Sequence, residues 1–158
     1  MSHYLLTGAS GFLGRRVLAG LLARGDACTA LGRASVDGVK TVRADLASEF
    51  NLSCDALDCV VHAAGLAHRV ARAPSEAEQF LRVNLLGTKL LVAALERASN
   101  IPAQMIFIST VAVYGVETGR MLDEGTPAEA QAPYGRSKRE AEEYLRDWCA
   151  KAGVRLVI

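Results

Sequence analysis

Short apolar runs that alternate with stretches of helical periodicity constrain the fold of this chain more than any other feature of its sequence. The apolar runs cover residues 3–7, 27–32, 39–43, 59–64, 104–109 and 154–158. The clearest helical patterns cover residues 12–23, 76–99 and 134–152, and the second is compatible with a break near Asn84. Parallel strands need connections of helix length, so the alternation predicts an α/β fold, a doubly wound parallel sheet of six strands with helices on both faces.

Length and composition fit one folded domain. The chain has 158 residues, which is enough for one hydrophobic core and short for two. Hydrophobic residues make up 51% and charged residues 22%, which argues against disorder. The formal net charge of +1 gives no electrostatic reason to expect nucleic acid or an anionic membrane as a partner. No leader follows Met1 and no apolar stretch approaches the roughly 20 residues of a membrane span, so we expect a cytoplasmic protein.

The cysteines do not form a recognisable site. Cys28, Cys54, Cys59 and Cys149 show neither CxxC spacing nor a nearby group of histidines. We therefore expect no metal site, and we interpret these residues as small buried side chains in a reducing compartment.

The segment "LLTGASGFLG" (residues 5–14) leads from the first apolar run through three glycines into the first helical pattern. Such a turn lets backbone approach a pyrophosphate, whose charge is favoured by the helix N-terminus. The spacing GxxGxxG departs from the common GxGxxG, and a tight turn without a ligand is the alternative. We expect the cofactor contacts of this turn to come from Gly8, Ser10, Gly11, Phe12, Leu13 and Gly14.

The end of the second apolar run carries an arginine where a dinucleotide fingerprint usually has an acidic residue. The segment "ALGRAS" (residues 30–35) offers Arg33 and no carboxylate. An arginine can bind a ribose 2′-phosphate with two hydrogen bonds, and a carboxylate there would repel that phosphate. The segment therefore favours NADP over NAD, with an exposed loop arginine as the alternative.

Segments in a fixed order give the chain its resemblance to a known family. They are "TGASGFLG" (7–14), "ADL" (44–46), "VVHAAG" (60–65), "VNLLGT" (83–88), and "ISTVAVYG" (108–115) followed by "YGRSK" (134–138). With them the chain resembles the extended branch of the short-chain dehydrogenase/reductase family, which comprises nucleotide-sugar epimerases, dehydratases and reductases. The resemblance implies a Rossmann-type, NAD(P)-binding domain over residues 1–158 and a C-terminal substrate domain that this chain lacks.

The resemblance also implies where the cofactor lies. Asp45 would meet the adenine edge, with Leu46 beside it. Ala63, Ala64 and Gly65 would pack against the ribose and the pyrophosphate. Without the resemblance, Asp45 is equally well explained as a turn residue.

The family's catalytic positions match Asn84, Thr110, Tyr134 and Lys138. Tyr134 and Lys138 lie four residues apart in a predicted helix, so their side chains share one face. A nearby ammonium favours the phenolate form of a tyrosine, which can take a proton from a substrate hydroxyl or return it to a carbonyl. The resemblance implies that Asn84 organises the site and that Thr110 holds the reacting oxygen. It also implies that Tyr134 and Lys138 contact the cofactor, with Lys138 at the nicotinamide ribose. Without it, these residues fit a helix-surface pair, a helix-breaking amide and a strand end.

Other polar residues near these motifs are weaker candidates. His62 lies inside an apolar run and is interpreted as a satisfied core histidine rather than a general base. His68, in the following loop, is better placed to approach a ligand, and we assign it no role. Tyr114 competes with Tyr134, but position 118 is a threonine, so Tyr114 lacks a lysine four residues on.

These residues predict an NAD(P)-dependent oxidoreductase or epimerase that acts on a nucleotide-activated sugar by hydride and proton transfer at C4. The motifs are similar to those of aminosugar 4-ketoreductases and epimerases of bacterial surface-polysaccharide biosynthesis. Two alternatives stay open: a non-catalytic NAD(P)-binding or redox-sensing module, and a truncated fragment that binds cofactor without turnover. The intact Tyr134 and Lys138 pair counts against the module, while the apolar terminal run indicates a longer parent chain.

The resemblance further implies a homodimer formed through the helices that hold Asn84 and Tyr134. On the second helix, Ala141, Leu145 and Trp148 form an apolar stripe. The sequence alone does not decide whether this stripe packs on the sheet or on another subunit, and core packing is the default expectation.

Two local segments carry further signals. The segment "ARAPSEAEQF" (residues 71–80) offers Ser75 as a helix N-cap, with Glu78 as its capping-box partner. Residues 116–133 form a long polar stretch without periodicity, and a loop of that length is usually functional or mobile.

Overall fold

The secondary structure follows the predicted alternation. The computed structural model describes residues 1–67, 73–116, 118–119 and 121–158. Its strands are β1 (His3–Thr7), β2 (Ala27–Gly32), β3 (Lys40–Arg43), β4 (Cys59–His62), β5 (Gln104–Phe107) and β6 (Arg155–Val157). Its helices are α1 (Phe12–Ala23), α2 (Pro74–Phe80), the π-helix η1 (Leu81–Leu86), α3 (Gly87–Arg97), the 3₁₀-helix η2 (Val111–Tyr114) and α4 (Pro133–Ala152). Every predicted element is present, with boundaries that shift by a few residues.

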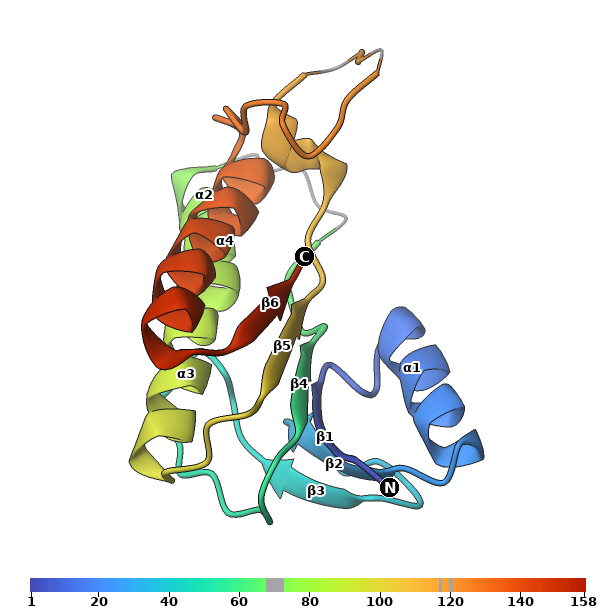
Figure 1. The fold of residues 1–158 in the computed structure, drawn as a ribbon. Coiled ribbons are helices and arrows are strands. Elements are labelled where there is room, and N and C mark those ends of the chain that lie inside the picture. Colours follow the sequence, from blue (N-terminus) through green and yellow to red (C-terminus); the bar gives the residue numbers. More distant parts are fainter. Residues whose placement is uncertain (68–72, 117, 120) are drawn as a thin grey trace.

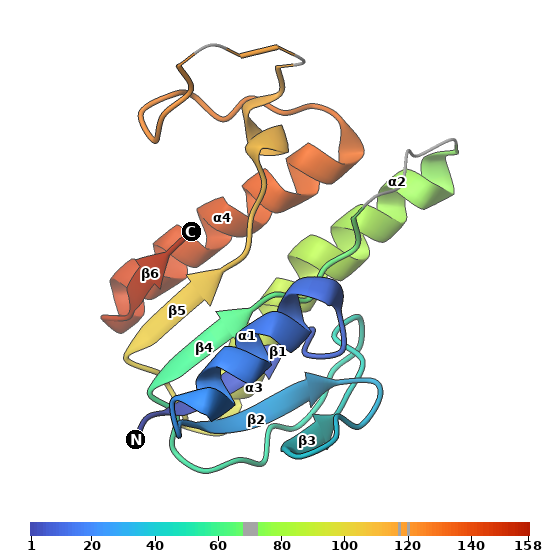
Figure 2. The same cartoon turned by 90° about the vertical axis from the view of Figure 1, so that its right-hand side faces the viewer.

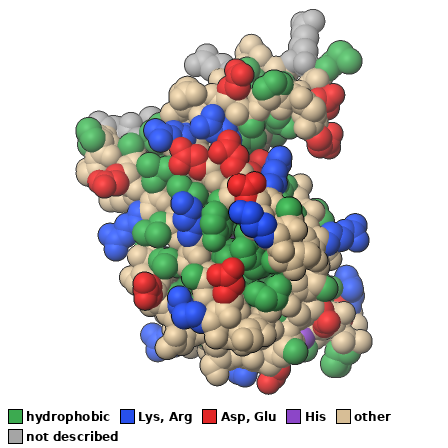
Figure 3. All heavy atoms as spheres, turned by 60° about the vertical axis from the view of Figure 1, so that its left-hand side comes forward, with side chains coloured by type: hydrophobic (Ala, Val, Ile, Leu, Met, Phe, Trp, Pro, Cys, Tyr) green, Lys and Arg blue, Asp and Glu red, His purple; other side chains and the backbone are tan. Residues whose placement is uncertain are grey.

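The described strands form one parallel sheet in the order β3-β2-β1-β4-β5-β6. Helix α1 covers one face, and α3 and α4 cover the other (Figure 1, Figure 2). On the side of the molecule where α3 and α4 lie, hydrophobic side chains are exposed among charged ones (Figure 3). The predicted doubly wound fold is confirmed. The strand order reverses between β1 and β4, the point beyond whose carboxyl ends open parallel sheets bind ligands.

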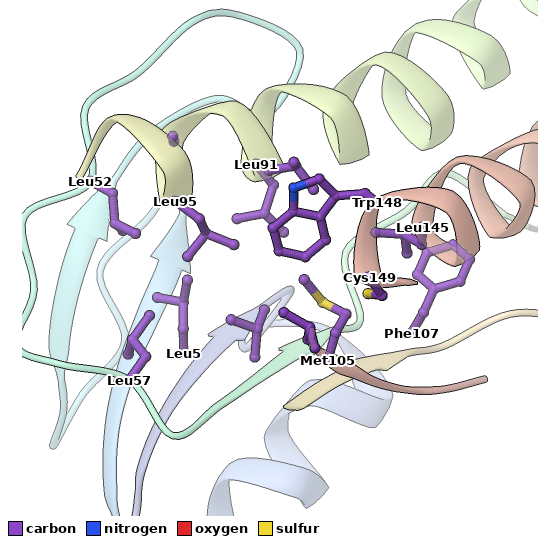
Figure 4. Packing of buried hydrophobic residues seen from close by; sticks show 14 of the residues in the cluster. Leu5, Leu52, Leu57, Leu91, Leu95, Met105, Phe107, Leu145, Trp148 and Cys149 are labelled. Carbon is purple, nitrogen blue, oxygen red and sulfur yellow. The ribbon is translucent and has the colours of Figure 1, made fainter. Parts of the chain in front are cut away.

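Two buried layers lie on opposite faces of the sheet, because successive strand residues point to opposite sides. Leu6 of β1 packs in the layer beneath α1, while Leu5 packs in the larger layer beneath α3 and α4. Figure 4 shows Leu145 and Trp148 of α4 beside side chains of α3 and β5. The stripe of Ala141, Leu145 and Trp148 is buried in this larger layer, which confirms core packing.

Strands β4 and β5 end two residues earlier than predicted, at the carboxyl edge of the sheet. The backbone groups just beyond them are bound partly by side chains. The amide of Ala64 donates to the Thr7 hydroxyl (3.0 Å), and the carbonyl of Ile108 accepts from Lys138 Nζ (2.5 Å). The Ile108 amide still donates to the His62 carbonyl of β4 (3.1 Å), and residues 63–65 and 109–110 lie outside the strands.

The long helical segment after β4 starts and bends differently from the prediction. Helix α2 begins at Pro74 with Ala73 as its N-cap, so the predicted capping box at Ser75 and Glu78 is wrong. Proline suits the first helical position because its φ is preset and it has no N–H to leave unpaired. The helix is not broken at Asn84: it widens into the π-helix η1 and continues as α3. Such π-turns are rare in proteins overall, and those that occur are often found at functional sites.

The cysteines behave as small buried side chains. All of Cys28, Cys54, Cys59 and Cys149 are free, and each except the half-buried Cys54 is buried. Burial raises the pKa of the three buried thiols to about 11, which makes them poor nucleophiles. Across the described part of the chain, no helix combines the length and apolarity needed to cross a membrane.

Candidate active site

The glycine turn after β1 is shaped by close backbone contacts. Gly8 has a φ of +71°, which favours glycine, and a Cβ there would lie 2.7 Å from the amide nitrogen of Ala64. A Cβ on Gly14 would collide with the carbonyl oxygen of Gly8. The glycines therefore let the turn, α1 and the loop after β4 approach one another at the point where the strand order reverses.

The N-terminus of α1 is open to solvent. Its N-cap, Gly11, makes no side-chain capping bond, and the first turn carries no acidic residue. The first N–H groups of a helix lack intrahelical acceptors, and the helix dipole favours an anion beside them. Ser10 is exposed, and the side chains of Phe12 and Leu13 are 90% and 43% exposed. The predicted turn residues thus surround a surface that suits a phosphate group.

The loop after β4 joins this turn to the Asn84 region. A Cβ on Gly65 would lie 3.1 Å from Asn84 Oδ1 and 3.8 Å from Lys138 Nζ. Leu66 donates its amide to Asn84 Oδ1 (2.7 Å), and its carbonyl accepts from Asn84 Nδ2 (3.1 Å). The predicted cofactor loop is therefore in direct contact with Asn84 and lies close to Lys138.

Asn84 connects this loop to α4. It is buried within the π-helix η1, and its Nδ2 also donates to Ser137 Oγ at 2.9 Å. Ser137 Oγ in turn donates to the carbonyl of Tyr134 at 2.7 Å. Asn84 thus holds the first turn of α4 as well as the loop.

Lys138 is buried at the end of β5. Its side chain is 5% exposed, and Nζ donates to the Ile108 carbonyl and lies 4.0 Å from the centroid of the Phe107 ring. Burial lowers its pKa to about 8, and the Glu142 carboxylate opposes that shift. The ammonium is therefore fixed in place and is largely protonated at neutral pH.

Tyr134 and Thr110 lie on packed neighbouring elements. Tyr134 is half-buried near the start of α4, with its ring centroid 5.8 Å from that of Phe80. Thr110 is the N-cap of η2, and its Oγ1 accepts from the Ala112 amide (3.2 Å). A Cβ on Gly135 would collide with the Ala112 carbonyl, so the first turn of α4 lies directly on η2.

The competing tyrosine is used elsewhere. The hydroxyl of Tyr114 donates to the carbonyl of Asp123 at 2.9 Å, within the long polar segment that follows η2. The Asp123 carboxylate accepts from Gly125 N and Thr126 Oγ1, both at 3.0 Å, and so organises a turn in that segment. Tyr114 therefore supports the loop, which leaves Tyr134 as the tyrosine beside a lysine.

Two site residues were missed by the sequence analysis. Ser109 Oγ donates to Glu142 Oε1, and Glu142 is 6% exposed and ion-paired with Arg146 (3.2 Å). Their signals were present in the sequence, since Ser109 precedes Thr110 and Glu142 follows Lys138 by one helical turn. Neither signal points to a partner 33 residues away.

The remaining predicted contacts lie in loops at the same edge of the sheet. Arg33 is exposed just after β2. The Asp45 carboxylate accepts from the Ala47 amide (2.9 Å), as a turn residue does, and the Leu46 carbonyl lies 3.3 Å from the position of a Cβ on Gly87. The structure does not bring these residues into contact with Tyr134.

The structure tests the prediction for His62 but not the one for His68. His62 is 1% exposed, and both of its ring nitrogens have hydrogen-bond partners, which confirms the interpretation as a satisfied core histidine. His68 lies outside the described residues. Within those residues, no group of three or more His, Cys, Asp or Glu side chains could hold a metal ion.

The chain is similar to known proteins along nearly its whole length. A model of the NAD dependent epimerase/dehydratase family matches residues 4–158. N-acetyl-alpha-D-glucosaminyl-diphospho-ditrans,octacis-undecaprenol 4-epimerase of Escherichia coli O157:H7 is 35% identical over 155 residues, which cover 95% of this chain and 44% of that protein. UDP-glucose 4-epimerase of Erwinia amylovora is 30% identical over 167 residues, which cover 94% of this chain and 48% of that protein.

A solved structure extends the agreement to the fold. UDP-glucose 4-epimerase of Thermus thermophilus, in complex with NAD, is similar with a TM-score of 0.80 at 27% identity. The similarity covers 98% of this chain and 53% of that one. The chain therefore spans about half the length of the relatives it matches.

Proposed function

Because the chain belongs to the NAD dependent epimerase/dehydratase family, we propose that it binds a nicotinamide dinucleotide and serves hydride and proton transfer at C4 of a nucleotide-activated sugar. Membership in this family confirms the resemblance stated from the sequence motifs. The observation that carries the proposal is the closeness of Gly65, near the reversal of strand order, to Asn84 and Lys138: a Cβ on Gly65 would lie 3.1 Å from Asn84 Oδ1 and 3.8 Å from Lys138 Nζ. The names of both curated relatives, which are 4-epimerases, support C4 as the reacting carbon.

The described residues fit such a cofactor. The glycine turn and the first turn of α1 would hold the pyrophosphate, since that helix start has no side-chain cap and no acidic residue. Asp45 would meet the adenine edge, and Lys138 would reach the nicotinamide ribose. When bound, the nicotinamide supplies a hydride donor or acceptor.

The protein's own residues would transfer the proton of the substrate hydroxyl. Lys138 lies one helical turn from Tyr134, which places both side chains on the same face of α4. Tyr134 would take the proton from the substrate hydroxyl, or return it to the carbonyl. Thr110 keeps its own hydroxyl proton available, because its oxygen accepts only a backbone hydrogen bond, and it would hold the reacting oxygen.

The choice between NAD and NADP is proposed to depend on Arg33. Its exposed guanidinium after β2 supports NADP, whereas the NAD bound by the Thermus thermophilus relative supports NAD. If Arg33 selects NADP, Arg33→Ala lowers the ratio of NADPH to NADH affinity in a fluorescence titration. An unchanged ratio would show that Arg33 has no part in the choice.

Substrate binding and assembly are proposed from the relatives and from the surface. Because the relatives are about twice as long, we place the substrate domain in sequence beyond Ile158. A surface hollow over α2, η1 and α3, whose lining includes Leu81, Leu85 and Leu86, supports the part of the homodimer interface that is expected on the Asn84 helix. The free thiols fit a reducing compartment, and the cytoplasm is the proposed location.

A single substitution separates catalysis from binding. Tyr134→Phe keeps the ring beside Phe80 and removes the acid/base group. We expect NADH to bind this chain with unchanged affinity, while turnover of UDP-glucose by the protein encoded by the whole gene falls by at least about 100-fold. Retained turnover would overturn the role of Tyr134. Cofactor binding without turnover in the unsubstituted whole protein would favour a non-catalytic module.

A further inference from the structure

His62 occupies the middle of a buried polar path that no catalytic role requires. It lies at the end of β4, opposite Thr7 of β1 in the strand register, and its ring is tilted against Phe107 at a centroid distance of 5.5 Å. Its Nδ1 lies 2.7 Å from Thr7 Oγ1, and its Nε2 lies 2.9 Å from Thr88 Oγ1 of α3. A buried imidazole with two partners therefore joins the sheet to the helix that follows the π-turn.

The partners determine which nitrogen carries the proton. Thr88 Oγ1 donates its single hydrogen to the Asn84 carbonyl at 2.6 Å, because a carbonyl can only accept. Thr88 must therefore accept from His62, which places the proton on Nε2. Burial, with a smaller effect of the nearby Lys138 charge, lowers the pKa of His62 to about 3, so the ring is neutral and Nδ1 accepts from the Thr7 hydroxyl.

The path extends to the glycine-turn loop on one side and to the Asn84 π-turn on the other, the two parts of the proposed site. On one side, Thr7 Oγ1 accepts from the amide of Ala64, in the loop that touches the glycine turn. On the other side, the path reaches the carbonyl of Asn84, whose side chain bonds to Ser137, the residue that donates to the Tyr134 carbonyl. The His62 ring thus joins the dinucleotide loop to the catalytic face of α4, in addition to the two direct hydrogen bonds between Leu66 and Asn84.

We propose that His62, as the neutral Nε2–H tautomer, is a positioning residue that sets the spacing between the glycine-turn loop and the Asn84 π-turn, so that one dinucleotide can contact both. This inference rests on the proposed function, because the dinucleotide is the ligand that bridges the two halves. ADP lacks the nicotinamide half, so it would contact the glycine turn and not the Asn84 π-turn. Loss of the link should therefore weaken NAD⁺ binding and leave ADP binding in place.

The tautomer is tested directly, without any cofactor. In the ¹⁵N-labelled chain, two-bond nitrogen–proton correlations of the imidazole report which nitrogen is protonated, and a His62→Gln variant assigns the signals. We expect a neutral ring with its proton on Nε2 near neutral pH. A proton on Nδ1, or a doubly protonated ring, would contradict the hydrogen-bond path.

The coupling is tested with a matched pair of threonine variants. Thr88→Val removes the acceptor of His62 while keeping the side-chain shape. Thr29→Val removes the same kind of bond, since Thr29 Oγ1 lies 2.9 Å from His3 Nε2 at the opposite end of the sheet. We expect Thr88→Val to raise the ratio of the NAD⁺ to the ADP dissociation constant by about fivefold or more, and Thr29→Val to leave it unchanged.

A third variant keeps the test informative if one protein is unstable. Glutamine at position 62 retains a donor near the place of Nε2, whereas His62→Phe retains the ring and removes both hydrogen bonds. His62→Gln should therefore stay closer to the native ratio than His62→Phe. If Thr88→Val and His62→Phe both bind NAD⁺ with a native-like ratio of the NAD⁺ to the ADP dissociation constant, the positioning role of His62 is overturned and the proposed function stands. Failure of the native chain to bind NAD⁺ would overturn the proposed function, and this inference with it.

Discussion

At the scale of single residues, burial sets the charge states on which the site depends. Lys138 and His62 are both nearly inaccessible, and burial is the main cause that lowers the pKa of each. Motif spacing identified Lys138 as a candidate from the sequence. Its partners could not be identified in this way, because the Ile108 carbonyl that fixes Nζ lies 30 residues away in the chain.

The buried lysine makes stability depend on pH. The pKa of Lys138 falls from 10.5 to about 8 on folding, so between these values the unfolded chain binds more protons than the folded one. The free energy of unfolding therefore rises with pH across that window. Relative to a Lys138→Met variant, the native chain should gain at most roughly 3 kcal/mol from pH 8 to 10.5.

Urea unfolding at several pH values measures this gain. The buried thiols Cys28, Cys59 and Cys149 have pKa values raised to about 11, so they lower the stability of both proteins above pH 9. This shared effect cancels in the difference between native and Lys138→Met. A difference that stays flat across the window would show that the folded lysine titrates normally.

At the scale of elements, α4 holds the segment after β5 at two points. Lys138 donates to the carbonyl of Ile108, and Glu142, one turn later, accepts from the hydroxyl of Ser109. Both contacts immediately precede Thr110, which begins η2. The helix therefore sets the position of the residue proposed to hold the reacting oxygen.

Ser109→Ala tests this attachment. It leaves the buried Glu142 carboxylate without the Ser109 donor, which should lower the free energy of unfolding by about 1–3 kcal/mol in urea titration. The exposed Ser35→Ala serves as a control and should change stability by less than about 0.5 kcal/mol. Equal stabilities of the two variants would mean that the Glu142 contact contributes nothing.

The same elements show how far the sequence could predict the structure. Periodicity located the strands and helices, because strand and helix patterns depend on nearby residues. The early ends of β4 and β5 and the π-turn at Asn84 could not be predicted in this way. Each depends on side chains from distant elements, such as Thr7, which lies 57 residues from Ala64, and Ser137, which lies 53 from Asn84.

At the scale of the whole molecule, the two faces of the sheet are covered unequally. In the described part of the chain, α1 covers one face and α3 and α4 the other (Figure 2). Val157 and Ile158, at the β6 edge, are 37% and 46% exposed. This exposed apolar edge is consistent with relatives of about twice the length.

If the chain forms the proposed homodimer, a charged side chain placed in the interface should separate the two subunits. Leu86 is 42% exposed and lines the hollow on η1 and α3, so Leu86→Glu should convert a dimer into a monomer in sedimentation velocity. Leu22→Glu is the matched control, because Leu22 is 43% exposed on α1, away from that surface. A native chain that sediments as a monomer, or two variants that behave alike, would contradict this interface.

Dinucleotide binding at the glycine turn is tested by a fluorescence titration of NADH into the native chain and two charge variants. Ser10→Glu places a carboxylate in the exposed glycine turn, and Ala19→Glu adds the same charge further along the exposed side of α1. If the turn holds the pyrophosphate, the native chain and Ala19→Glu bind NADH alike, while Ser10→Glu binds about tenfold more weakly or worse. Equal affinities for all three proteins, or no binding by the native chain, would contradict dinucleotide binding at this site.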